Sequence, residues 1–487
     1  MRLGDLAPHL PMSDRMAEVE IRGLAIDSRE VEPGFLFAGL PGSQVDGMTF
    51  AATAAQRGAA AILGPPTSAH YPGGAIALKV TNPRQEIARI AARFFGRQPK
   101  VIAAVTGTAG KTSVAEFLRQ IWRQCGHRNS ASIGTLGIVR PDGETYGSLT
   151  TPDPIELQRN LAELQTLGVD HLAMEASSHG LDQYRLDGVR LAAAAFTNLG
   201  RDHMDYHPTI EDYLSAKARL FTELLPEGAP AILDMQAPYA AQMAAICQRH
   251  GRDVRSVGKD GSFLRLISLS VDLEGARQRL TVEAAGQTHD VMLPLIGGFQ
   301  VSNALIAAGL AASTGVPAAD ALAALSELQG AAGRLQLIGE TRQVRVFVDY
   351  AHKPDAVREI LTTLREVTSG ALAIVLGAGG DRDAGKRPLM GEAAGQGADR
   401  VYVTDDNPRS ENPAEIRRAI LEACPGGIEI GDRAQAIRQA ISDAQPGDVV
   451  VVAGKGHEPG QIVGDTVLPF SDIDVVEMIL SESEVGG

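Results

Sequence analysis

The chain has 487 residues, a formal net charge of −14 and 44% hydrophobic residues. Its length exceeds what one hydrophobic core usually organises, so we expect about three domains, and its acidic charge argues against a protein that coats nucleic acid, because phosphates are neutralised by surplus Lys and Arg. Its scattered cysteines, and the absence of an apolar run of roughly 20 residues, favour a globular protein of the reducing cytoplasm without membrane insertion.

Residues 1–98 have the pattern of a small α/β domain. Short apolar runs alternate with Gly and Pro turns, as in residues 34–42, and the Ala-rich stretch at 50–58 favours a helix. The helical pattern stops near residue 98, and a run typical of a buried strand begins at Val101. We therefore predict a domain boundary near residue 98.

A glycine-rich loop follows the predicted strand at 101–106 and precedes a helix whose apolar residues recur at 3-4 spacing. Gly107 and Gly110 allow backbone N–H groups to approach phosphate oxygens. Lys111 supplies a cation to the β- and γ-phosphates, and Thr112 offers a hydroxyl to Mg²⁺. The alternative is a tight turn whose lysine points outward, but the order of strand, loop and helix favours nucleotide binding.

Candidate metal ligands follow two further strands of the region 99–332, where apolar strands alternate with amphipathic helices as in a doubly wound parallel sheet. Glu175 and His203 follow such strands, and ligands gather at the carboxyl ends of parallel strands. Glu175 and Thr112 offer oxygen atoms suited to Mg²⁺, whereas the imidazole of His203 suits Mn²⁺ or a second metal position. A zinc site formed by His203 and His207, or a packing role for both histidines, stays open as an alternative.

The alternation of strands and helices restarts after Gly333-Arg334. This spacing predicts a third, Rossmann-like α/β domain over 333–487. Its predicted strands cover residues 344–348, 373–376, 400–403 and 448–453.

Several motifs along the whole chain resemble the Mur ligase family, and within it the tripeptide synthetases. These motifs are Asp27-Ser-Arg29, Gly42-Ser-Gln-Val-Asp-Gly47, the loop at 107–112, Tyr213-Leu-Ser-Ala-Lys-Ala-Arg-Leu-Phe221, Gly379-Gly-Asp-Arg-Asp383, Asp406-Asn-Pro-Arg409 and Gly454-Lys-Gly-His-Glu458. The resemblance implies a uridine-nucleotide domain at 1–98, a central ATP-binding domain at 99–332 and a C-terminal domain at 333–487 that binds the amino-acid substrate.

The resemblance also implies an activity in peptidoglycan synthesis, and hence in cell-wall biogenesis, cell shape and cell division. Such a ligase uses ATP and Mg²⁺ to add meso-2,6-diaminopimelate to UDP-N-acetylmuramoyl-L-alanyl-D-glutamate through an acyl phosphate. Its partners would be these small molecules, and we expect a monomer.

The family's functional residues carry over to matching positions of this sequence. The ATP site would consist of Gly107, Thr108, Ala109, Gly110, Lys111, Thr112, Ser113, Asn303, Arg334 and Asp349. The UDP-muramoyl-dipeptide site would consist of Ile26, Ser28, Ser43, Gln44, Val45, Thr150, Thr151, Ser177, Gln183 and Arg185. The diaminopimelate site would consist of Arg382, Asp406, Asn407, Pro408, Arg409, Gly454 and Glu458.

Lys217 matches the lysine that the family carbamylates, which turns a cation into a carboxylate beside the metal ligands Thr112, Glu175 and His203. Without the resemblance, Lys217 would be an ordinary exposed helix lysine. The resemblance assigns catalytic roles to Lys111, His203 and Lys217. One departure from the family stands in the phosphate loop, where Ala109 replaces the usual Asn and removes a side-chain contact to the nucleotide or the metal.

Three alternatives stay open. A ligase that adds L-lysine would be expected to lack Arg409. A folylpolyglutamate-type ligase would share the phosphate loop but lack the uridine domain and the C-terminal pocket. A nucleotide-driven switch would show no substrate-dependent phosphate release.

Overall fold

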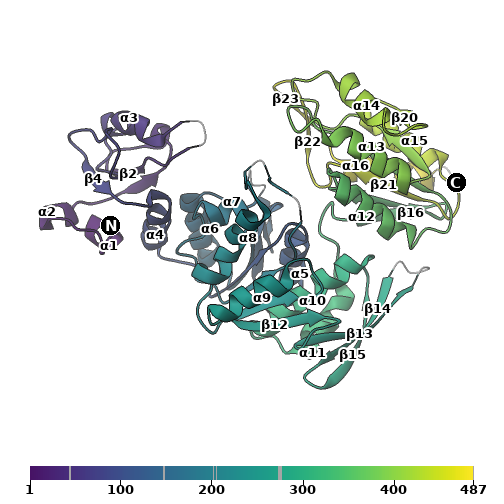
Figure 1. The fold of residues 1–487 in the computed structure, drawn as a ribbon, viewed down its shortest axis with the longest axis horizontal. Coiled ribbons are helices and arrows are strands. Elements are labelled where there is room, and N and C mark those ends of the chain that lie inside the picture. The colour runs from purple at the N-terminus through teal and green to yellow at the C-terminus, as the bar shows by residue number, and fades with distance from the viewer. Residues whose placement is uncertain (43–44, 146–148, 201, 205, 273–276, 486–487) are drawn as a thin grey trace. The chain divides into compact units, whose positions relative to one another are not determined.

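The computed structural model describes the chain except residues 43–44, 146–148, 201, 205, 273–276 and 486–487 (Figure 1). By its internal contacts the chain divides into two compact units, Met1–Arg265 with Leu305–Leu322 and Leu266–Ala304 with Ala323–Gly487. Across the described residues, no helix combines the length and the apolar character needed to cross a membrane.

The N-terminal region is a parallel four-stranded sheet in the order β1-β2-β3-β4, which confirms the predicted small α/β fold. Its strands are β1 (Gly23–Ala25), β2 (Phe35–Ala38), β3 (Ala61–Gly64) and β4 (Ile76–Lys79). Its helices are α1 (Leu3–Leu6), α2 (Asp14–Ala17), η1 (Ser28–Glu30), η2 (Gly47–Phe50), α3 (Ala51–Gln56) and α4 (Pro83–Phe95). The side chain of Asn82 accepts a hydrogen bond from Gln85 N at the start of α4, and Gly96 ends the helix with a positive φ.

The central sheet has eleven strands in the order β15-β14-β13-β12-β11-β10-β5-β9-β6-β7-β8. Its first strands in the chain are β5 (Val101–Thr106), β6 (Ser130–Gly134), β7 (Gly137–Arg140), β8 (Gly143–Thr145), β9 (His171–Glu175) and β10 (Ala193–Phe196). The later ones are β11 (Pro230–Asp234), β12 (Asp253–Gly258), β13 (Leu264–Asp272), β14 (Arg277–Ala284) and β15 (Gln287–Leu293).

Strands β6, β9, β5, β10, β11 and β12 of this sheet are parallel, as predicted, but both edges add antiparallel pairs. Among the described strand pairs, β6/β7, β7/β8 and β14/β15 are antiparallel, so the sheet is mixed. Strand β8 is exposed along its length, and β14 alternates buried with exposed residues. Such strands lack the continuous apolar run from which a buried parallel strand is predicted.

Helices cover the central sheet. They are α5 (Lys111–Gln124), α6 (Pro154–Thr166), α7 (Ser178–Asp182), α8 (Ile210–Arg219), η3 (Leu220–Leu224), α9 (Ala240–Arg249), α10 (Gly298–Ser313), α11 (Ala318–Ala323) and η4 (Ala324–Glu327). Helix α5 buries Val114, Phe117, Leu118, Ile121 and Trp122, the residues whose spacing predicted it.

The C-terminal region is a six-stranded sheet in the order β16-β17-β21-β18-β19-β20, with only β16 antiparallel among its described pairs. Its strands are β16 (Gln336–Thr341), β17 (Val344–Asp349), β18 (Leu372–Leu376), β19 (Arg400–Val403), β20 (Ile428–Glu429) and β21 (Val449–Ala453), and β22 (Gly460–Val463) and β23 (Thr466–Pro469) form a hairpin. Its helices are α12 (Pro354–Arg365), α13 (Lys386–Gly397), α14 (Pro413–Leu421), α15 (Arg433–Asp443) and α16 (Asp472–Val485). Because β21, β18 and β19 are parallel neighbours, the loops after them leave the same edge of the sheet.

Candidate active site

The phosphate loop joins β5 to α5 and is fixed against the end of β10. Thr197 Oγ1 donates to the carbonyl oxygen of Ala109 at 2.6 Å, and Ala109 N donates to Asn198 Oδ1 at 3.0 Å. A Cβ on Gly107 would lie 1.8 Å from Thr197 Oγ1, so only glycine fits there. Thr197 and Asn198 were not predicted as site residues, although both follow a predicted strand.

Lys111 begins α5 and folds back over its own loop. Its Nζ donates to the carbonyl oxygens of Gly107 at 3.0 Å and Thr108 at 3.1 Å. The lysine thus holds its charge next to the backbone that would cradle phosphates.

Lys217 on α8 is buried, with 1% of its surface exposed, so the expectation of an exposed helix lysine is wrong. Its Nζ donates to the carbonyl oxygen of Gly107 at 2.7 Å and lies 4.2 Å from the ring centre of Tyr213. Burial lowers the pKa of Lys217 well below its ordinary value, and the charge of Lys111 lowers it further. These surroundings favour the neutral amine, which is the nucleophilic form of lysine.

Glu175 ends β9 and is buried beside the phosphate loop. Its Oε1 accepts from Thr135 N at 2.8 Å, and its Oε2 accepts from Thr135 Oγ1 at 3.2 Å. Glu175 and Thr112 line one small pocket, together with Glu116 and Ser132. This set of oxygen atoms fits Mg²⁺, which prefers carboxylate and hydroxyl ligands.

His203 follows β10 and has a φ of 54°, a conformation unusual for a residue other than glycine. Its Nε2 lies 3.4 Å from Asp202 Oδ2, and its ring centre lies 4.8 Å from that of His179 and 6.4 Å from that of Tyr213. In the described part of the chain, neither His203 nor His207 belongs to a group of three possible ligands at metal-binding spacing. The zinc alternative therefore gains no support here.

The predicted dipeptide residues form one hydrogen-bonded network that reaches Glu175. Thr151 is buried, and its Oγ1 donates to the carbonyl oxygen of Glu175 at 3.1 Å while it accepts from Ser177 N at 3.1 Å. Arg185 donates to the carbonyl oxygen of Thr151 at 2.7 Å and to Gln183 Oε1 at 2.7 Å. These residues were predicted from the resemblance to the family and not from a local pattern.

Thr150 and Tyr206 extend this network. The hydroxyl of Thr150 lies 3.2 Å from that of Thr135, and Gln183 Nε2 donates to the Tyr206 hydroxyl at 3.2 Å. Burial lowers the pKa of Arg185, and the nearby cation Arg84 of α4 lowers it further. Neither Tyr206 nor Arg84 was predicted.

The predicted uridine site is described in part. Ser43 and Gln44 lie outside the described residues. Ser28 is buried in η1, where Asp27 Oδ1 accepts from Arg29 N at 2.9 Å, and Ile26 packs against the N-terminal core. Val45 is exposed. The described residues thus give a fixed turn at 26–29, and the assignment to UDP stays a prediction.

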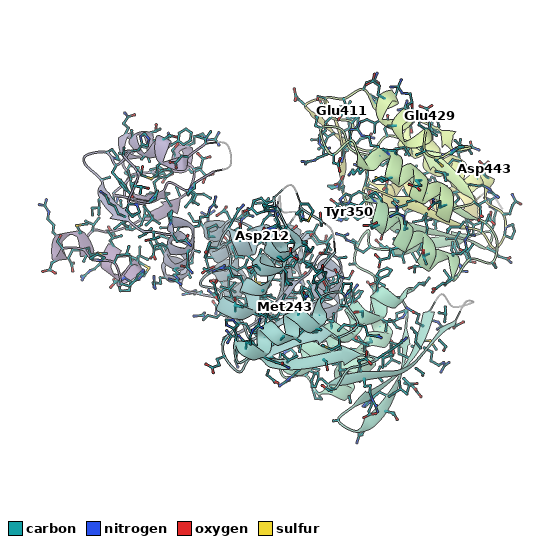
Figure 2. The ribbon with its side chains drawn as sticks, viewed as in Figure 1. Asp212, Met243, Tyr350, Glu411, Glu429 and Asp443 are labelled. Carbon is teal, nitrogen blue, oxygen red and sulfur yellow. The ribbon has the colours of Figure 1, made fainter. Side chains whose placement is uncertain are left out.

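The second unit contains the other predicted ATP residues, Asn303, Arg334 and Asp349. Gln300 links the first two, because its Nε2 donates to the carbonyl oxygen of Arg334 at 3.4 Å and its Oε1 accepts from Asn303 Nδ2 at 3.4 Å. Asp349 accepts from Leu335 N at 2.6 Å, and burial raises its pKa although Arg334 opposes the shift. The guanidinium of Arg334 stacks 4.6 Å from the ring centre of Tyr350, which is labelled in Figure 2.

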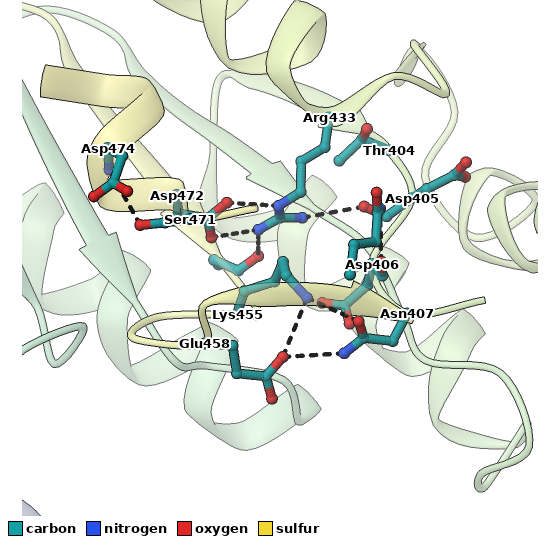
Figure 3. Close-up of polar contacts among 12 residues, drawn as sticks. Thr404, Asp405, Asp406, Asn407, Arg433, Lys455, Glu458, Ser471, Asp472 and Asp474 are labelled. Atoms are coloured by element: carbon teal, nitrogen blue, oxygen red, sulfur yellow. Dashed lines mark hydrogen bonds and ion pairs between the residues drawn. The ribbon is translucent and has the colours of Figure 1, made fainter. Parts of the chain in front are cut away.

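The loops after β19 and β21 meet around a buried lysine (Figure 3). Lys455 Nζ, fully buried, donates to Asn407 Oδ1 at 2.9 Å and pairs with Glu458 Oε2 at 3.1 Å. Asn407 Nδ2 donates to the same Glu458 oxygen at 3.0 Å. Lys455 was not predicted, although it stands inside the motif Gly454-Lys-Gly-His-Glu458.

A second buried ion pair supports these loops. Arg433 donates to both carboxylate oxygens of Asp472 at 2.7 Å, and both side chains have no exposed surface. Arg433 also donates to the carbonyl oxygen of Ala453 at 3.0 Å, just before Gly454. A Cβ on Gly454 would lie 2.7 Å from Asp406 Oδ2, so the two loops approach closely only because this residue is glycine. Neither Arg433 nor Asp472 was predicted.

Arg409 is anchored through its backbone to the β22–β23 hairpin. Its N donates to the carbonyl oxygen of Ile462 at 3.0 Å, and its own carbonyl oxygen accepts from Gly464 N at 2.8 Å. Its Nη1 donates to the carbonyl oxygen of Gly380 at 2.8 Å, so the guanidinium lies along the loop that follows β18. Arg382 stands on that loop and is exposed, and Pro408 is buried beside Arg409. The predicted amino-acid residues therefore come from three loops at one edge of the sheet.

Three domain families match the chain in sequence order. They are "Mur ligase family, catalytic domain" at residues 20–96, "Mur ligase middle domain" at 105–311 and "Mur ligase, glutamate ligase domain" at 333–456. The "UDP-N-acetylmuramoyl-L-alanyl-D-glutamate--2,6-diaminopimelate ligase" of Mesorhizobium japonicum is 54% identical and covers 99% of both chains. The protein of the same name from Brucella melitensis is 57% identical over 93% of both chains. A solved structure of a ligase with this name is 32% identical, with a TM-score of 0.75 over 99% of both chains. The chain therefore belongs to the Mur ligase family.

Proposed function

We propose that the chain is an ATP-dependent ligase that adds meso-2,6-diaminopimelate to UDP-N-acetylmuramoyl-L-alanyl-D-glutamate in peptidoglycan synthesis. One observation carries the proposal: a relative named for this reaction is 54% identical over 99% of the chain. Support also comes from the loop at 107–112, Glu175 and Asn407, which stand at or just after the carboxyl ends of β5, β9 and β19, where ligands gather in such sheets.

Forming an amide from a carboxylate needs a leaving group better than oxide. In the proposed reaction the γ-phosphoryl group of ATP moves to the side-chain carboxylate of D-glutamate, which gives an acyl phosphate and ADP. An amine of diaminopimelate then attacks the acyl carbon, the C–N bond forms, and phosphate leaves as the nitrogen loses a proton. Positioning and charge neutralisation do most of the work in such transfers.

Each step has candidate residues in this chain. The backbone N–H groups of the loop at 107–112 and the Lys111 cation would bind the phosphates. Thr112 and Glu175 would hold Mg²⁺, which supplies charge neutralisation at the transferred phosphoryl group. The Thr150, Thr151, Ser177, Gln183 and Arg185 network adjoins Glu175, so a dipeptide bound there would present its carboxylate near the phosphate loop.

Lys217 is proposed to be carbamylated. Its amine, shifted toward the neutral form, would attack CO₂, form an N–C bond and lose a proton, which yields a carbamate. The new anion would lie beside Lys111, which lowers the pKa of the unmodified lysine and would stabilise the modified one.

The diaminopimelate assignment rests on the pocket around Arg409, Asn407 and Glu458. meso-Diaminopimelate carries a second amino-carboxylate terminus that L-lysine lacks, and a guanidinium can bind a carboxylate through two parallel hydrogen bonds. Arg409 and Arg382 would take the carboxylates, and Glu458 would accept from an ammonium group. A monomeric state and a cytoplasmic location stay predictions of the sequence.

The proposal is tested by phosphate release from ATP with each substrate omitted in turn. We expect release only when UDP-N-acetylmuramoyl-L-alanyl-D-glutamate is present, and the tripeptide product only when diaminopimelate is added. Phosphate release that ignores the dipeptide would instead support a nucleotide-driven switch.

A further inference from the structure

Three possible metal ligands lie at the amino end of β9, which is the end of the strand opposite to the proposed active site. The ligand atoms of His127, Asp170 and His171 all lie within 4.8 Å of one another. His171 begins β9 and Glu175 ends it, and four residues of strand span about 13 Å. The cluster is therefore separate from the phosphate loop and plays no part in the reaction derived above.

The backbone around the cluster is fixed by the sheet and by a turn. Val101 N donates to the carbonyl oxygen of Asp170 at 2.9 Å, and His171 pairs in register with both Val101 and Ser130 of the neighbouring strands. His127 N donates to the carbonyl oxygen of Trp122 at 2.8 Å after α5 ends. The ligands are thus held by elements that the central fold already fixes.

The three side chains lie against one another. The ring centres of His127 and His171 are 3.9 Å apart, and Asp170 Oδ1 lies 3.0 Å from His171 Nδ1. The side chain of His171 is 7% exposed and that of Asp170 is 51% exposed, so an ion could enter from the Asp170 side.

We propose that His127, Asp170 and His171 form a binding site for a divalent transition-metal ion of the zinc class. Two imidazole nitrogens and one carboxylate oxygen are ligands that Zn²⁺ accepts, whereas Mg²⁺ prefers oxygen atoms alone. Three protein ligands leave a fourth position for water.

The chain carries a reporter next to this cluster. Its only tryptophan, Trp122, has its ring centre 5.1 Å from that of His171. Co²⁺ takes the same ligands as Zn²⁺ and quenches nearby tryptophan fluorescence. Lys111 begins α5 eleven residues before Trp122, a distance of roughly 16 Å along the helix, so an ion in the phosphate loop should quench far less.

The experiment uses the full chain without an affinity tag, stripped of metal and kept in excess Mg²⁺ to occupy the proposed active site. Zn²⁺ is titrated by calorimetry, and Co²⁺ by the fluorescence of Trp122. We expect one equivalent of Zn²⁺, quenching by Co²⁺, and a rise in Tm on adding Zn²⁺. His127→Gln and Asp170→Asn should each weaken binding by at least about tenfold.

Two control variants locate the ion. His70→Gln removes an exposed histidine of the N-terminal region, and His203→Gln removes the histidine beside the proposed active site; both should bind Zn²⁺ like the wild type. His127 is partly exposed, so circular dichroism and the metal-free Tm of His127→Gln should match the wild type. The proposal is overturned if Zn²⁺ does not bind, if folded His127→Gln binds it equally well, or if His203→Gln abolishes the quenching.

Discussion

Two buried lysines, Lys217 and Lys455, show how the partner of a buried cation decides its role. Lys217 donates to one carbonyl oxygen and lies near another cation, Lys111, and its pKa is lowered. Lys455, in the loop after β21, instead forms an ion pair with Glu458 and donates to Asn407 of the loop after β19. Burial beside Lys111 pushes Lys217 toward the neutral, reactive form, whereas Lys455 is held in an ion pair with Glu458.

Removing the Lys217 amine should have the largest effect on catalysis. We expect Lys217→Ala to lower the ligation rate by roughly 10²- to 10³-fold, as the loss of one preorganised charged group does elsewhere. Lys217→Glu should recover part of the rate, because a carboxylate stands in for the carbamate. Wild-type activity should rise with bicarbonate, and the intact mass should include one added CO₂. Equal rates for wild type and Lys217→Ala would show that the comparison of the two lysines is wrong.

Lys455→Met should instead act on stability and on substrate binding. Replacing Lys455 leaves Glu458 without its cation, so we expect the free energy of unfolding to fall by about 2–4 kcal/mol and the KM for diaminopimelate to rise. Lys217→Met should keep or raise stability, because it replaces a desolvated amine with an apolar side chain. Urea unfolding of both variants, with the exposed Lys259→Met as control, measures the difference. Similar losses of stability in Lys217→Met and Lys455→Met would contradict the proposed difference between the two lysines.

The pH dependence of stability gives a third comparison. Folded Lys217 without carbamate binds fewer protons than the unfolded chain between its lowered pKa and the ordinary value of 10.5. Its contribution to stability is therefore unfavourable at low pH and improves as pH rises through that window. In bicarbonate-free buffer, the Tm of the wild type minus the Tm of Lys217→Met should increase as pH rises. A Tm difference that does not change with pH would contradict the lowered pKa.

Ala109→Asn should have the smallest effect. Ala109 belongs to the phosphate loop, in which the carbonyl oxygen of Gly107 accepts from Lys217. The backbone N–H of Ala109 already donates to Asn198 Oδ1. If the asparagine adds one modest hydrogen bond to nucleotide or metal, the KM for ATP should fall by a factor of a few. Steady-state kinetics over a range of ATP and Mg²⁺ concentrations measures this. An unchanged KM would indicate that Thr197 and Asn198 already compensate for the missing contact of the family's usual Asn side chain.

Local patterns predicted the parts of the molecule that depend on neighbours in the sequence. The phosphate loop, helix α5 and the parallel strands β5, β9, β10 and β11 follow from apolar runs and glycine positions. Antiparallel edge strands escaped prediction, because their half-exposed residues look like loop.

Long-range pairs could not be predicted from one sequence. Arg433 and Asp472 are 39 residues apart, and nothing local marks them as partners. The burial of Lys217 also escaped prediction, because it depends on the packing of α8 against the phosphate loop and not on the helix pattern itself. The resemblance to a family supplied Lys217, whereas Lys455 and Arg433 required the structure.

The substrate preference of wild type and Arg409 variants tests the proposed function most directly. Arg409 donates one N–H group to the carbonyl oxygen of Gly380. Because a guanidinium has five N–H groups, Arg409 can still bind a carboxylate through two of them. Ligation rates are measured with meso-diaminopimelate and L-lysine for wild type, Arg409→Ala and Arg409→Lys. We predict that the wild type prefers diaminopimelate by at least ~10³-fold, that Arg409→Ala loses most of this activity, and that Arg409→Lys restores little of it. A wild type that prefers lysine, or an Arg409→Ala variant that keeps its preference for diaminopimelate, would contradict the assignment.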